Sequence, residues 1–252
     1  MRKILKYVII IVSSILIFVL GGFAINAGTE QVIVNVKISN FMKLGVYQED
    51  ISNGIIKYYK VSMKDERPGY IMSGSSMMPG NYGDIITSHS TYVVNELLTT
   101  IKDFNVGGHA AIVTGNYYDS RLSMTKYDSI EATGMDEDPN VAKVSNRTYW
   151  NDEDYFKQVV CYRTHLSEEE LDEVVSVASG HLGDPYNYNF TFDTLNKSYC
   201  SDLISKVFDK VNLNLNKDGF WTTVWDIMVS PDLYITYYHY ISNGVKYVYY
   251  VG

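Results

Sequence analysis

The sequence contains few cysteines and few basic residues, and each shortage excludes a class of protein. Only two cysteines occur among 252 residues, Cys161 and Cys200, and no zinc-binding spacing is present. A disulfide between the two thiols and a reactive role for one of them are both open. Lysine and arginine number 21 against 29 acidic residues, a formal net charge of −8. Such a surface repels phosphate backbones, so we expect no nucleic-acid partner.

The first 27 residues (1–27) form a segment of their own. Three basic residues precede an apolar run over about 7–25, close to the ~20 residues that span a bilayer as a helix. The basic flank predicts a cytoplasmic N-terminus and an extracytoplasmic remainder. Run length favours a retained membrane anchor. A cleaved signal peptide, with Ala24 and Ala27 as the small residues before the cut and a secreted product, is the alternative.

Patterns typical of strands lie on both sides of a mixed central region. Residues 28–76 form a β-rich extension, because 31–38 partly alternates polar and apolar residues and 55–61 follows an Asn-Gly turn signal. Residues 233–252 form a tyrosine-rich tail with a second Asn-Gly turn signal. Between them, 77–232 mixes predicted strands (109–114, 127–132 and 155–163) with predicted helices (91–104, one beginning with a capping box at Ser167, and 200–211).

Cys200 is the candidate nucleophile. It lies in the first turn of a predicted helix with Ser198 as N-cap, where unpaired backbone N–H groups and the helix dipole favour a thiolate. A thiolate nucleophile needs a base, and His109 opens a strand after two glycines that leave its ring accessible. Glu131 ends the next predicted strand and could fix the imidazole tautomer.

Each candidate also has a purely structural interpretation. A cysteine in a helix is most often a small buried hydrophobe, and Cys161, inside a predicted strand, fits an inert thiol. Asn116 or Asp84 could replace Glu131 as the orienting group, although Asp84 is expected to satisfy turn amides. Positions at helix ends account for His165 and His181. The roles of His89 and His239 remain open. The acidic turn at 136–138 lacks the rest of a calcium loop, so no metal is expected.

Short motifs follow one another over about residues 79–231. They are Gly83-Asp84-Ile85, Gly108 to Gly115, Ile130-Glu131-Ala132, Leu182 to Tyr188 and Tyr199 to Leu203. In this order they resemble the circularly permuted NlpC-type hydrolases, and most closely the YiiX-like permuted papain-like amidases. In that group the histidine precedes the cysteine, as it does here, whereas ordinary NlpC-type enzymes have the reverse order.

The resemblance implies an α+β fold. Its centre would be a circularly permuted papain-like (NlpC-type) core, with a small antiparallel sheet packed on helices and extra β-hairpins at the N- and C-terminal ends. It implies Cys200 as nucleophile, His109 as general base and acid, and Glu131 as the orienting group. An upstream tyrosine, Tyr186 or Tyr188, would line the oxyanion side together with the Cys200 backbone N–H. No cofactor is implied.

The resemblance also implies a function, an extracytoplasmic cysteine hydrolase that cleaves an amide through a thioester intermediate. Cell-wall peptide is the default substrate, on family analogy alone. A lipid-linked amide or ester is the alternative, because related permuted thiol enzymes act as acyltransferases or lipid esterases. A non-catalytic surface binding module is the competing class. Its mark would be loss of a triad residue, and none is lost.

Overall fold

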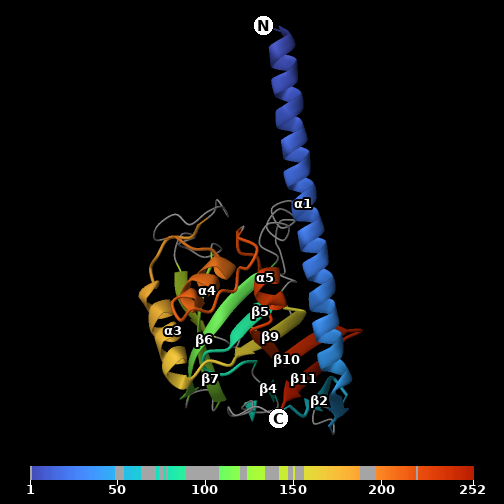
Figure 1. The fold of residues 1–252 in the computed structure, drawn as a ribbon. Helices are drawn as coiled ribbons and strands as arrows, with labels where there is room; N and C mark the ends of the chain where they lie inside the picture. The colour runs from blue at the N-terminus through green and yellow to red at the C-terminus, as the bar shows by residue number, and fades with distance from the viewer. Residues whose placement is uncertain are drawn as a thin grey trace.

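The structure is a computed structural model of the α+β class, in which one sheet is covered on one face by helices (Figure 1). It describes residues 2–48, 54–63, 72–73, 76–77, 79–88, 108–119, 124–133, 142–146, 150, 156–187, 197–219 and 221–252. The predicted helix over 91–104 lies outside this part of the chain.

The main sheet has nine strands in the order β1-β2-β11-β10-β9-β5-β6-β7-β8. The sheet is mixed, because β11 and β2 pair in parallel while the other neighbours are antiparallel. The five strands of the expected core, β5 to β9, are antiparallel to their neighbours within that core, but the whole sheet is larger and mixed because β1, β2, β10 and β11 extend it. The strands near both chain ends join the central ones, since β10 pairs with β9 and β11 pairs with β2. The bounds are Gly45–Tyr47 (β1), Ile56–Val61 (β2), Ile85–Ser88 (β5), His109–Asp119 (β6), Met124–Ala132 (β7), Ala142–Asn146 (β8), Gln158–Thr164 (β9), Leu233–Ser242 (β10) and Val245–Val251 (β11), with Met72–Ser73 (β3) and Ser76–Met77 (β4) as a separate pair.

Three shorter helices lie on one face of the sheet: α3 (Glu168–Gly180), α4 (Cys200–Asp209) and α5 (Val224–Val229). The capping box predicted at Ser167 is confirmed, because Ser167 and Glu170 bond reciprocally. The predicted N-cap of α4 was wrong: Tyr199 holds that position, without a side-chain cap bond. Ser198 instead pairs in extended conformation with Tyr186, which keeps it out of the helix.

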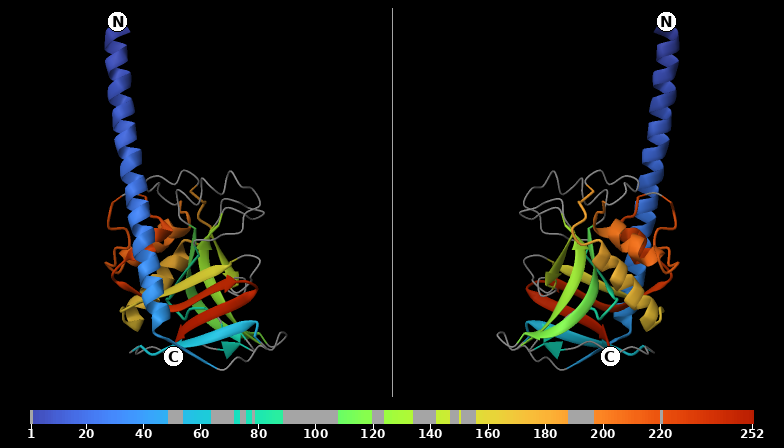
Figure 2. Two further views of the ribbon diagram at one scale, coloured as in Figure 1. Left: turned by 90° about the vertical axis from the view of Figure 1, so that its right-hand side faces the viewer. Right: turned by 90° about the vertical axis from the view of Figure 1, so that its left-hand side faces the viewer.

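The first helix, α1 (Arg2–Lys43), runs past the body of the protein at its N-terminal end and packs against the body at its C-terminal end (Figures 1 and 2). The strand expected over 31–38 is thus wrong, because that segment is part of α1. Val34, Ile38 and Phe41 are buried at helical spacing against α5 and β10, and this packing outweighs the strand preference of β-branched residues. No helix in the described ranges is both long enough and apolar enough to cross a membrane.

Apolar side chains pack on both faces of the sheet. The larger cluster lies between the sheet and the four helices and includes Cys200. The smaller cluster lies on the opposite face, and Ala111 and Val113 of β6 contribute to it together with Trp150 and Phe156. Because side chains alternate along a strand, His109 shares this second face with Ala111 and Val113.

Candidate active site

Cys200 opens α4 and is completely buried. Its Sγ lies 3.7 Å from the carbonyl oxygen of Gly108, so the start of the helix meets the start of β6. Helix α4 packs on β6 and β7 through a strongly apolar face. The N–H groups and the dipole at the start of a helix favour a thiolate at this position.

His109 and Glu131 form a buried hydrogen-bonded pair. His109 is the first residue of β6, and its Nε2 lies 2.8 Å from Oε2 of Glu131 on β7. Ile112 pairs with Ile130 across these antiparallel strands. Because side chains alternate, His109 and Glu131 share the face of the sheet opposite to these two isoleucines. With Nε2 engaged, Nδ1 is the ring atom left for the Cys200 side chain, which is the second hydrogen-bond partner of His109.

The environment of His109 favours its charged form. Burial by itself lowers the pKa of the imidazole, but the Glu131 carboxylate and the Cys200 sulfur outweigh it and raise the pKa of His109 to about 9. The imidazole therefore holds its proton at neutral pH. A protonated imidazole beside a sulfur at a helix start stabilises an ion pair with the thiolate.

An aromatic wall backs the histidine, and sequence reasoning missed it. The Trp150 ring stacks on the His109 ring at 5.5 Å between centroids, and Phe156 stacks on Trp150 at 4.5 Å. Trp150 is fully buried. These rings restrict rotation of the imidazole and exclude water from its bond to Glu131. No local signal marks Trp150, because the contact joins segments about 40 residues apart.

The two candidate tyrosines are placed differently. Tyr186 is 5% exposed and pairs with Ser198, which puts it beside the turn leading into Cys200. Tyr188 lies outside the described residues.

The Asp84 side chain bonds to its own turn and to the neighbouring strand β9. Its carboxylate accepts bonds of 2.8 Å from Nε and Nη2 of Arg163 and from the backbone N–H of Asn81. The expectation that Asp84 satisfies turn amides is confirmed. The side chain of Asn116 is outside the described part of the structure.

Contacts within the fold account for the remaining cysteine and for three more of the histidines. Cys161 and Cys200 are both free and lie in different apolar clusters, so the disulfide alternative was wrong. His165 stacks on Tyr234, His181 pairs with Asp184 at 2.8 Å, and buried His239 bonds to the Tyr237 hydroxyl. His89 and the acidic turn at 136–138 fall outside the described residues.

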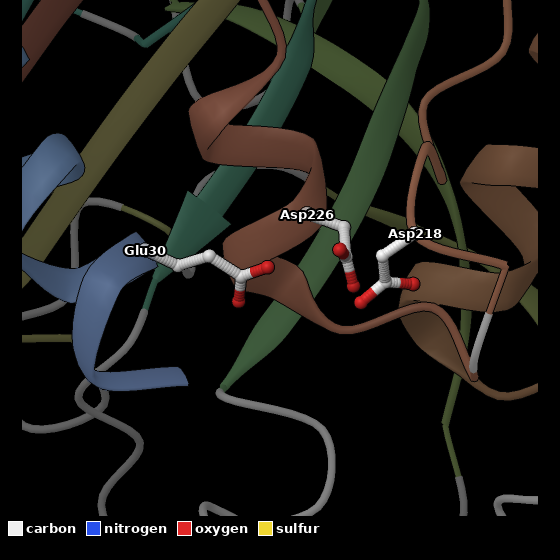
Figure 3. Close-up of side chains that lie close together, drawn as sticks. All are labelled: Glu30, Asp218 and Asp226. Atoms are coloured by element: carbon white, nitrogen blue, oxygen red, sulfur yellow. The ribbon is translucent and has the colours of Figure 1, made fainter. Parts of the chain in front are cut away.

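One group of acidic side chains in the described ranges brings three carboxylates together. Glu30 of α1, Asp226 of α5 and Asp218 point toward one another, with oxygen atoms within 4.8 Å (Figure 3). They come from different elements than His109 and Glu131. Acidic groups cluster in many proteins that hold no ion there, so this group does not establish a metal site.

A thiol at the start of a helix, facing a sheet histidine held by a carboxylate, is the arrangement of papain-like cysteine hydrolases. Comparison with protein families matches residues 80–221, more than half of the chain, to the permuted papain-like amidase enzymes of the YaeF/YiiX, C92 family. The chain belongs to this family, and the matched range contains Cys200, His109 and Glu131. A search of curated proteins found no match.

Proposed function

We propose that this protein is a cysteine amidase in which Cys200, His109 and Glu131 act as a triad. The observation that supports it best is the buried chain of contacts from the Cys200 thiol through His109 to Glu131. The order of groups is that of a nucleophile, a base and an orienting carboxylate. Glu131 keeps the Nε2–H toward itself, so Nδ1 exchanges protons at the reaction centre.

The reaction proceeds in two halves. The Cys200 thiolate attacks the amide carbonyl carbon, and a tetrahedral oxyanion forms. As it collapses, the C–N bond breaks, His109 gives its proton to the leaving amine, and a thioester remains. Neutral His109 then takes a proton from water, the hydroxide attacks the thioester, and the C–S bond breaks. C–S cleavage releases the thiolate beside the imidazolium that the proton of water has formed, so the thiolate–imidazolium pair is restored. The carboxylic acid leaves and gives its own proton to solvent.

The oxyanion would be held at the start of α4. The backbone N–H of Cys200, the first residue of α4, is one proposed donor. The hydroxyl of Tyr186 is the second proposed donor, because Tyr186 pairs with the residue two positions before the nucleophile. Tyr188 is the alternative within the same motif.

For substrate and location, we propose an amide in cell-wall peptide, cleaved outside the cytoplasm. The basic residues and apolar run of segment 1–27 support that location and, with it, a membrane-anchored or secreted form. A lipid-linked acyl group is the alternative substrate, since a thioester can be resolved by water or by an acceptor. The products separate hydrolysis from acyl transfer, because hydrolysis releases the free acid and transfer consumes an added amine or alcohol. Turnover of a peptide amide or of a lipid ester separates the two substrates.

The first test is thiol reactivity, which needs no known substrate. We expect iodoacetamide to label Cys200 of the full chain rapidly at pH 7, because His109 and the start of α4 favour its thiolate. Cys161 is equally buried but lies in the middle of strand β9, so it should label slowly and serve as the internal control. Cys200→Ala removes the fast site. His109→Ala slows it by about 10²-fold, because the partner that stabilises the thiolate is gone. Equal slow labelling of both cysteines in the wild type would refute the enzyme and favour a binding module.

A further inference from the structure

Helix α1 contacts α5 at both ends. Near the N-terminus of α5, the Glu30 carboxyl lies beside Asp226 and bonds to it (Figure 3). Asn26 donates bonds of 2.9 Å to Glu30 and to Asp218. At the other end, Lys37 Nζ donates to three backbone carbonyls, those of Met228 (3.1 Å), Ser230 (2.8 Å) and Leu233 (3.3 Å). A lysine among the last carbonyls of a helix is a favourable C-terminal partner.

The contact between these two polar ends is apolar. Val34 is completely buried and Ile38 is 5% exposed, and both belong to the cluster that includes Ile227 and Met228 of α5. Glu30, Val34, Lys37 and Ile38 are spaced as one face of α1. A six-residue helix is too short to be stable alone, so α5 depends on its neighbours for its position. It also contacts α4, β5 and β10, but its contact with α1 is the most extensive.

Thr222, the residue just before the N-cap of α5, is hydrogen-bonded to residues 199–201, which we call the nucleophile turn. Ser201 Oγ donates a buried bond of 2.9 Å to the carbonyl oxygen of Thr222, and Tyr199 also bonds to the Thr222 backbone. Tyr199 and Ser201 are the neighbours of Cys200 on either side. Thr223 caps α5 by reciprocal bonds with Asp226, so Thr222 moves with α5.

We infer that α1 is a positioning element for the nucleophile: it fixes α5, α5 fixes Thr222, and Thr222 holds Ser201 so that the Cys200 sulfur faces His109. The inference rests on the proposed function, because its consequence is the reactivity of that thiol. Lys37 and Ser201 are positioning residues and touch no reacting atom. An error of about 1 Å at a catalytic group costs about 10²-fold in rate, so a small shift of α5 is enough to matter.

A double-mutant cycle tests the connection. The second-order rate of Cys200 labelling by iodoacetamide is measured across pH in the full chain, for wild type, Lys37→Met, Ser201→Ala and the double variant. We expect each single change to slow labelling at pH 7 by about 5- to 10-fold, within the 5- to 150-fold range of couplings between sites. We also expect the pH at which the rate reaches half its maximum to rise. The double variant should be no more than about 2-fold slower than the slower single one, because residues acting through one connection are not additive.

Matched variants separate positioning from general damage. Lys37→Arg keeps a donor to the carbonyls and should restore most of the rate. Lys43→Met, at an exposed lysine near the end of α1, and Ser205→Ala, on α4, should leave it unchanged. If Lys37→Met does not fold, Asn26→Ala replaces it in the cycle, with a smaller slowing that Ser201→Ala again masks.

Two results would overturn the inference. In one, Lys37→Met leaves Cys200 labelling unchanged while Ser201→Ala slows it. In the other, the two effects multiply in the double variant. Both leave the proposed function standing, since wild-type Cys200 would still react rapidly and His109→Ala would still slow it. A slow wild-type Cys200 refutes the proposed function first, and the positioning role with it.

Discussion

Two buried groups, one at the active site and one at the α1–α5 contact, hold a proton at neutral pH for opposite electrostatic reasons. His109 is protonated because Glu131 offers a negative charge, so the proton creates an ion pair. Glu30 is protonated because burial and the negative charge of Asp226 raise its pKa to about 8, so the proton removes a repulsion. Neither Glu30 nor Asp226 forms an ion pair with a basic side chain within the described residues.

The difference shows what each region is built to do. The candidate active site concentrates charge where the proposed thiolate would form, and the Trp150 ring packs against the His109 ring there. The α1–α5 contact neutralises charge so that two helices can approach. Replacing an acid by its amide should therefore damage the first region and spare the second.

The largest expected effect is at Glu131. Glu131→Gln keeps the shape of the side chain but removes the charge, so the imidazolium is no longer stabilised and the ring can adopt the wrong tautomer. We expect Cys200-dependent amide hydrolysis to fall by about 10²- to 10⁴-fold in kcat. The pKa of His109, followed by NMR, should drop below about 9. Glu131→Asp, which keeps the charge, should lose less activity, and equal losses in the two variants would remove the charge from the explanation.

The parts of this site that could be predicted are those determined by residues close together in the sequence. The strands that begin at His109 and end at Ala132 could be predicted from short apolar runs, and so could the helix that begins at Cys200. The neighbourhood of His109 and Glu131 then follows from antiparallel pairing of consecutive strands, while their catalytic roles stay predictions. The capping box at Ser167 is local in the same way.

What could not be predicted depends on contacts between distant segments. Residues 31–38 carry a strand-like pattern, and only packing of Val34 and Ile38 against α5, about 190 residues away, decides for helix. The stacking of Trp150 on His109 and the meeting of Glu30 with Asp226 are equally long-range. The same reason applies to the size of the sheet, since the strands at both chain ends extend it.

A smaller effect is expected at Glu30, and its sign follows from linkage. The folded-state pKa of Glu30 is about 8 against 4.5 for the ordinary side chain, so the folded state holds the proton more strongly. Its contribution to the free energy of unfolding is therefore complete below about pH 4.5 and is lost as the pH rises to about 8. Lys37 acts above that window with the opposite sign, because burial lowers its pKa from 10.5 to about 8.

Glu30→Gln should abolish the Glu30 part of this pH dependence. Urea unfolding at pH 5 and pH 8 measures it: we expect the loss of stability between these pH values to be smaller in Glu30→Gln than in the wild type. Glu169→Gln, at an exposed acid of α3, should behave like the wild type. If Glu30→Gln lost as much stability as the wild type over this interval, the proton on Glu30 would not be what joins α1 to α5. A cation that stabilises the wild type at pH 8 would show that an ion takes its place.

The smallest expected effect compares the two capping boxes. Both begin helices, but Ser167 and Glu170 are at the surface on α3, and Thr223 and Asp226 lie between α1 and the nucleophile turn. Loss of either cap by substitution with alanine should lower Tm by about 2–4 °C, as expected for about 1 kcal/mol in a chain of this size. Only Thr223→Ala should also slow labelling of Cys200, because only that cap is attached to Thr222. Equal labelling rates in Ser167→Ala and Thr223→Ala would mean that α5 stabilises the fold but does not position Cys200. The nucleophile turn would then be held by α4.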